Sequence, residues 1–189
     1  MSDVLTKQAV ARSQLLTALK LFFENDDIVS IYTLASNAWE IIDSLCDSQN
    51  VESLSNQTRD HIGSDKDLKK DFVNSPARNF FKHADRDPED LLEDFTELKC
   101  DGLLYLAVED YMRLHGTSPI EFQVFQLWYL SIYIEKVAAG ELTKILEPSE
   151  QIFPNIRNLN REGQKELWRK TLEKAKQDPE VLHDPRTEV

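Results

Sequence analysis

An arginine, an asparagine and a histidine lie close together in the middle of the chain, at Arg78, Asn79 and His83. These residue types suit metal-independent cleavage of a phosphodiester. The pKa of an imidazole is about 6.5, so the ring can move the proton of an attacking hydroxyl near neutrality. A guanidinium matches phosphate with two parallel hydrogen bonds and stabilises the charge that develops on it. The spacing therefore predicts His83 as acid-base, Arg78 as phosphate ligand and Asn79 as the group that orients either one.

Simpler interpretations of these residues remain open. The nine Arg and four His of the chain make such a pair common by chance. On a regular helix the five-residue step from Arg78 to His83 places the side chains about 140° apart, so they converge only around a distorted turn or a ligand. Arg78 is equally explained as a structural cation paired with an acid such as Glu40 or Asp85. His83 is equally explained as a buried, hydrogen-bonded ring.

The same segment also contains an H-x-D-x-D pattern at His83, Asp85 and Asp87, which could offer a metal ion one nitrogen and two oxygens. No second histidine lies nearby in the sequence. The only cysteines, Cys46 and Cys100, do not form a CxxC pair. The chain also has no P-loop and no dinucleotide-binding glycine run. We therefore expect neither a metal site nor a cofactor.

The residues before the motif predict a helical hairpin. Apolar residues recur at three- and four-residue steps through residues 3–24 and again through residues 28–45, which is the period of an amphipathic helix. The polar turn at 25–27 is so short that the two helices must run antiparallel. Residues 46–64, rich in Ser, Asn, Asp and Gln, predict a loop, and residues 65–74 predict a short polar helix.

A new turn or helix is expected to carry the motif itself. Pro76 suits the first turn of a helix, and the residue before a proline is pushed out of the helical region. A short helical piece is expected after Pro88. A longer amphipathic helix is then predicted over residues 97–115, where apolar residues again follow one face.

Residues 118–121, Ser-Pro-Ile-Glu, have the pattern of a capping box and predict the start of another helix. This helix covers residues 120–138 and is apolar nearly all round. It is therefore either the central helix of a bundle or a dimer surface. Gly140 and the two prolines within 148–154 predict a linker to a final basic helix at 161–177.

The hairpin, the sequence YTLASNAWEIIDSL in its second helix and the later ARNFFKH resemble a HEPN domain (higher eukaryotes and prokaryotes nucleotide-binding), over about residues 3–138. The resemblance implies an all-α bundle, usually dimeric, whose R-x4-6-H motif forms a composite metal-independent ribonuclease site across the dimer interface. Arg78 and His83 match the motif pair, and Asn79 matches its polar follower. The resemblance therefore implies a homodimer that acts on single-stranded RNA or binds a nucleotide.

The charge of the chain limits how RNA could bind. The formal net charge is −12, so phosphate groups need a local cluster of Lys and Arg. Residues 85–110 hold ten acids against two bases, whereas residues 157–176 hold seven bases against three acids. Both segments are simply explained as solvated faces. The acids that follow His83 would oppose RNA at that edge.

Together these observations predict an all-α fold: a helical bundle built on a long antiparallel N-terminal helix hairpin, with an extra C-terminal helix. We expect residues 1–140 to form the bundle and residues 141–189 to pack on it or extend it. No signal peptide and no apolar stretch of about 18 residues is present, which predicts a cytoplasmic protein with no membrane contact. The alternative function is a non-catalytic module that oligomerises or binds a partner protein through the apolar helix at 120–138.

Overall fold

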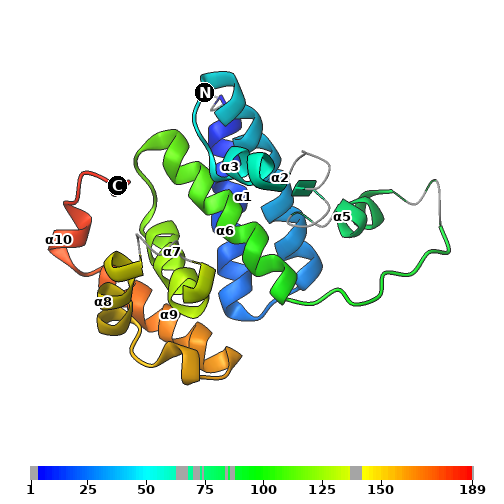
Figure 1. Ribbon diagram of the computed structural model, residues 1–189. Helices are drawn as coiled ribbons and strands as arrows, with labels where there is room; N and C mark the ends of the chain where they lie inside the picture. Colours follow the sequence, from blue (N-terminus) through cyan, green and yellow to red (C-terminus); the bar gives the residue numbers. More distant parts are fainter. Residues whose placement is uncertain are drawn as a thin grey trace. The chain divides into compact units, whose positions relative to one another are not determined.

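The computed structural model describes residues 4–62, 68–69, 73, 75–83, 85, 88–136 and 142–188. Within these ranges the secondary structure is helical apart from one isolated bridge between Ser118 and Thr187, which confirms the all-α fold (Figure 1). None of the helices in these ranges combines the length and the apolar character needed to cross a bilayer. The chain divides into two compact units, Met1–Leu114 and His115–Val189.

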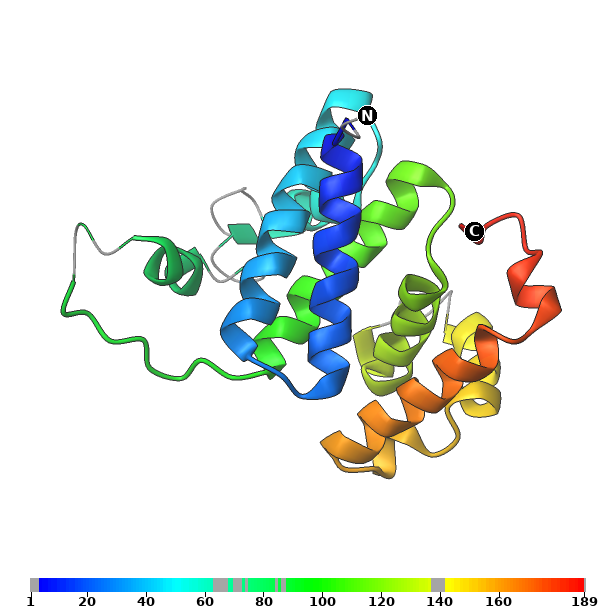
Figure 2. The same cartoon turned by 180° about the vertical axis from the view of Figure 1, so that it is seen from behind.

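The predicted N-terminal hairpin is confirmed. Helix α1 (Lys7–Glu24) and helix α2 (Ile28–Gln49) lie side by side in both views of the ribbon (Figures 1 and 2). The hydroxyl of Thr6 caps α1, and the carboxylate of Asp27 caps α2 by accepting from the N–H of Ser30. Asn25 adopts the left-handed conformation, with φ 57°, that ends α1 and permits so tight a turn.

The core of the first unit is made by the hairpin and helix α6 (Leu98–His115), which confirms the helix expected at 97–115. Each helix contributes a buried apolar stripe, as the three- and four-residue spacing indicated. Cys46 of α2 lies against the backbone of Asp110 in α6, with 3.8 Å between Sγ and the carbonyl oxygen. The largest buried side chains of this core belong to the hairpin and include Phe22, Phe23, Ile31, Tyr32 and Trp39.

The prediction of a loop at 46–64 is wrong for most of these residues. Helix α2 continues to Gln49, and helix α3 (Leu54–Ile62) follows after a short break. The polar composition conceals α3 because little of its surface is apolar. Its start is stabilised by side-chain acceptors: the hydroxyl of Ser53 accepts from the N–H of Asn56 at 3.0 Å, and Asp110 accepts two further N–H groups.

Helix α5 (Ser75–Lys82) forms where the proline predicted a new helical turn. The helix expected at 65–74 lies mostly outside the described residues. The short helix expected after Pro88 is wrong, because residues 90–96 are irregular and only a turn is present at 88–89. The like charges of this acidic segment repel one another, which disfavours a helix. Phe95 packs on Tyr32 and Phe81, whereas Leu91 remains 80% exposed.

In the second unit, helix α7 (Ile120–Ile132) packs against α8 (Leu142–Ile152) and α9 (Arg161–Ala175). Short helices η1 (Ile134–Lys136), η2 (Ile156–Asn158) and α10 (Pro179–Leu182) complete it. The basic C-terminal helix is confirmed, and α7 ends earlier than expected, at Ile132. About half of the α7 side chains are buried, and α7 contacts α8, α9, η1 and η2, so it is the central helix of the second unit, as the apolar pattern allowed. The second compact unit begins at His115, so α7 belongs to it.

Two local expectations in the second unit are wrong. The linker expected before the basic helix is largely the helix α8, which includes Pro148. A proline inside a helix loses one backbone hydrogen bond, but packing against α7 compensates for the loss. The capping box is also absent, because Pro119 is the N-cap residue and has no capping side-chain bond. Ser118 instead exchanges backbone hydrogen bonds with Arg186 and Glu188 at 2.8 and 2.9 Å.

Candidate functional site

Helix α5 carries the R-N-x3-H motif and lies against helix α2. Phe81 anchors it, because its ring packs edge-on against Tyr32 of α2 and against Phe95, with centroid distances of 5.6 and 5.1 Å. The helix ends at Lys82, and the N–H of His83 still donates to the carbonyl of Asn79 at 2.9 Å. Arg78 and Asn79 are therefore on the helix, and His83 is the first residue beyond it.

The guanidinium of Arg78 points toward α2, where one Nη donates to the carboxylate of Glu40. The Arg78 side chain is 19% exposed, so this ion pair is partly shielded from water. The pairing with Glu40 that was considered from the sequence is therefore confirmed. One turn later, Lys82 Nζ donates to Asn37 Oδ1 at 2.9 Å. Desolvation and the nearby Arg78 lower the pKa of Lys82, while Glu40 opposes the shift.

The other two motif residues face solvent. The His83 side chain is 57% exposed, and its Nδ1 lies 3.8 Å from the carboxylate of Asp85, so the interpretation of His83 as a buried ring is wrong. Asn79 is exposed as well. Because α5 is a regular helix through Lys82, Arg78 is directed to α2 while His83 lies beyond the helix end. A single chain does not bring the three side chains to one point.

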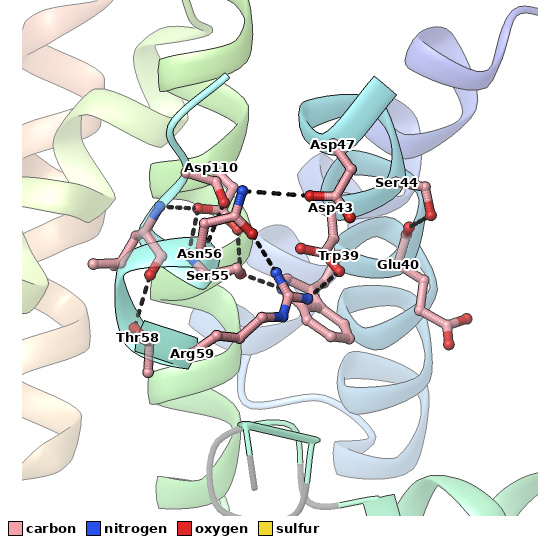
Figure 3. A network of polar contacts seen from close by, with 12 residues as sticks. Trp39, Glu40, Asp43, Ser44, Asp47, Ser55, Asn56, Thr58, Arg59 and Asp110 are labelled. Atoms are coloured by element: carbon pink, nitrogen blue, oxygen red, sulfur yellow. Dashed lines mark hydrogen bonds and ion pairs between the residues drawn. The ribbon is translucent and has the colours of Figure 1, made fainter. Parts of the chain in front are cut away.

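A second polar cluster, which the sequence did not reveal, joins α2, α3 and α6 (Figure 3). The Asp110 side chain of α6 is fully buried and accepts from the N–H groups of Leu54 and Ser55 at 2.7 and 3.2 Å. The Ser55 hydroxyl also donates to Asp110 and accepts from Trp39 Nε1 at 2.9 Å. Burial raises the pKa of Asp110 to about 6, although its hydrogen bonds with Ser55 and Leu54 act in the opposite direction.

The outer part of this cluster is an ion pair between Arg59 of α3 and Asp43 of α2, with 2.5 Å between Nη2 and Oδ2 (Figure 3). Arg59 also donates to Asn56 Oδ1 at 2.6 Å, and Asn56 Nδ2 donates to Asp47 at 3.3 Å. These contacts fasten α3 to the hairpin. One signal was present in the sequence: an acid at position 110, beside Ala107 and Tyr111 on the apolar face of a helix, is expected to have a buried partner.

No group of three or more His, Cys, Asp or Glu side chains among the described residues is arranged to hold a metal ion. Asp87, the third residue of the H-x-D-x-D pattern, lies outside those residues. His83 and Asp85 are both exposed and are 3.8 Å apart. The described geometry therefore gives no support for a metal at this pattern.

Asn79 and His83 thus face solvent at the C-terminal end of α5, and Arg78 is fixed to the hairpin at Glu40. Such an arrangement can present a guanidinium, an amide and an imidazole to a ligand that lies outside the chain. Comparison of the chain with models of known protein families, with curated proteins and with solved structures gave no match.

Proposed function

We propose that the chain is a HEPN-like domain that acts as a homodimer and cleaves single-stranded RNA without a metal ion. His83 moves the proton of the attacking hydroxyl, Arg78 binds the phosphate and Asn79 orients one of them. The observation that supports this most is the exposure of Asn79 and His83 beside an arginine that Glu40 holds in place. A guanidinium has five N–H donors, so the bond to Glu40 leaves others for phosphate.

The geometry of one chain supports the proposal of a dimer. Arg78 is directed toward α2 and His83 lies beyond the end of α5, so a single copy does not direct both side chains to one point. Two copies that face each other across α5 would let Arg78 of one chain and His83 of the other approach the same phosphate. The acidic residues after His83 would then have to lie away from the bound RNA strand, because they repel its phosphates.

Cleavage of a labelled single-stranded RNA in EDTA tests the proposal. We expect wild-type protein to leave cyclic-phosphate ends and His83→Ala to lose about a hundredfold or more in rate, because general acid-base catalysis typically contributes that much. His61→Ala is the matched control, since His61 is also an exposed histidine of the first unit. Equal cleavage by wild type and His83→Ala, or none by wild type, would remove the proposed mechanism.

A mixture of two inactive variants tests the composite site. In a mixed dimer of Arg78→Ala and His83→Ala chains, one site receives both residues from the two copies and the other site receives neither. Activity should therefore reappear when the two variants are mixed and re-associated. If each variant is inactive and the mixture is too, Arg78 and His83 do not act across a dimer.

A second candidate, a non-catalytic interaction module that binds a partner protein, is favoured by the same ion pair. If Arg78 serves only to fasten α5 to Glu40, the motif is structural, and apolar residues exposed on α5 and in the segment after it become candidates for contact with a partner protein. Phe80 and Leu91 are 40% and 80% exposed. On this account Arg78→Ala lowers stability and wild-type protein cleaves no RNA.

A further inference from the structure

A groove of about 630 Å³ runs along the C-terminal half of α2 and is also lined by Lys7 of α1 and by Lys69. The α2 residues that line it follow three- and four-residue steps and include Glu40, Ile41, Ser44, Leu45 and Ser48. From Trp39 to Ser48 the lining residues of α2 span about 14 Å of helix. Its volume is within the range of about 300–1,000 Å³ that is typical of small-molecule sites.

The lining of the groove holds two lysines and two acids, and two arginines outside the lining pair with those acids. Lys7 and Lys69 line it, as do the acids Glu40 and Asp43. Each acid is bound by an arginine: Glu40 by Arg78 and Asp43 by Arg59. These six side chains therefore comprise four cations and two anions, in a chain whose net charge is −12. A local excess of cations attracts anions and repels cations.

The groove also has apolar surface between its charged residues. Ile41 and Leu45 are half-buried and lie one turn apart on α2, and the buried Trp39 also lines the groove. Lys7 lies at the other end of the hairpin from the turn at 25–27, so it is opposite the C-terminal half of α2. The groove thus combines a cation at that end with an apolar strip along its length, which is the pattern expected for an amphiphilic anion.

We propose that this groove binds a small amphiphilic organic anion, a carboxylate or a phosphate monoester on a short apolar tail. The anionic group lies by Lys7, and the tail lies against Ile41 and Leu45. Binding at this site requires neither Arg78 nor His83 to react. The inference therefore goes beyond the proposed ribonuclease and can fail or hold independently of it.

Isothermal titration of the full chain with four probes tests this ligand class. Octanoate and octyl phosphate carry the anion and the tail, whereas octanol lacks the charge and octyltrimethylammonium reverses it. We expect both anions to bind and to move the amide NMR signals of Ile41 and Leu45. The anion that binds with the higher affinity shows whether the site prefers a carboxylate or a phosphate head group. Equal binding of octanol, or no binding of either anion at millimolar concentration, would overturn the proposal.

Lys7→Glu tests the position of the head group. The substitution places an acid in the first turn of α1, which favours the helix, so loss of binding would not reflect unfolding. We expect affinity for the anions to fall about three- to tenfold, because exposed charge pairs contribute modestly. Lys20→Glu is the matched control, since Lys20 is exposed on the same helix but does not line the groove. An equal effect of both substitutions would show that only net charge matters and would overturn the site.

Discussion

The carboxylate of Glu40 on α2 pairs with the guanidinium of Arg78 on α5, 38 residues later in the chain. The same carboxylate lines the groove along α2. One side chain therefore adjoins both the motif helix and the proposed anion site. The pair also fixes the orientation of the arginine on which the ribonuclease proposal depends.

Substitution of Arg78 should lower stability as well as activity. We expect Arg78→Ala to lower the free energy of unfolding by about 1–2 kcal/mol, because it leaves the partly shielded Glu40 without its cation. Urea denaturation measures the change. The double variant with Glu40→Gln should cost less than the two single substitutions together. Strictly additive costs would show that the pair contributes nothing to stability.

The buried carboxylate of Asp110 should make stability depend on pH. Its pKa is raised from 3.8 to about 6 in the folded protein, so the folded state binds the proton more tightly than the unfolded state. The resulting stabilisation is complete below about pH 4 and is lost as pH rises through about 6. Relative to Asp110→Asn, the free energy of unfolding of wild type should fall by up to about 3 kcal/mol between these limits.

This comparison needs a variant that remains folded, which circular dichroism can establish for Asp110→Asn. The amide keeps one oxygen to accept from the N–H groups of Leu54 and Ser55. If the free energies of unfolding of the two proteins change in parallel with pH, burial does not raise the pKa of Asp110. Its hydrogen bonds then keep the carboxylate ionised over the whole pH range. Asp110→Ala should be more damaging at neutral pH, because both N–H groups lose their acceptor.

The N-terminus of α9 depends on one side-chain cap. Asn160 Oδ1 accepts from the N–H of Gly163 at 2.9 Å. We expect Asn160→Ala to destabilise the chain by about 1 kcal/mol in thermal or urea unfolding. Asn158→Ala is the matched control, because Asn158 is an exposed asparagine two residues earlier and does not cap α9. Equal effects of the two substitutions would contradict the role of the cap.

The C-terminal tail is held to the start of α7 by Gln123. Its Nε2 donates to the carbonyls of Ser118 and Arg186 and to Thr187 Oγ1, at 3.1, 3.3 and 3.1 Å. In Gln123→Ala, we expect amide exchange of Glu188 to accelerate about fivefold, since these bonds oppose local opening. Gln151→Ala, an exposed glutamine on α8, should leave this exchange unchanged. Unchanged exchange in both variants would mean that the backbone bridge alone holds the tail.

Much of the fold could be predicted because its signals are local. The apolar stripes of α1, α2 and α6 and the short turn at 25–27 were enough for the hairpin and the later helix. Helix α3 was missed because its stability comes from distant partners, chiefly Asp110 and the Arg59–Asp43 pair. Helix α8 was missed because a proline such as Pro148 usually indicates the end of a helix. Packing against α7, which the sequence does not show, stabilises the helix in spite of the proline.

The candidate site was predictable in part. The residue types at Arg78, Asn79 and His83 suggested their chemistry, and Glu40 was among the acids considered for Arg78. Exposure was not predictable, because the sequence does not say which side of α5 faces α2, and His83 proved to be at the surface. The groove was also missed, since Lys7 and Lys69 approach α2 from separate parts of the chain.

The contact between Asp110 and the start of α3 has a consequence for the order in which the chain folds during synthesis. Ser53 can cap one N–H of α3 as soon as the helix forms, but the N–H groups of Leu54 and Ser55 have their acceptor 56 and 55 residues further on. A nascent chain that has not yet released Asp110 from the ribosome must leave those groups to water. Helix α3 is therefore expected to be stable only after α6 has packed against the hairpin, whereas the hairpin itself can form earlier.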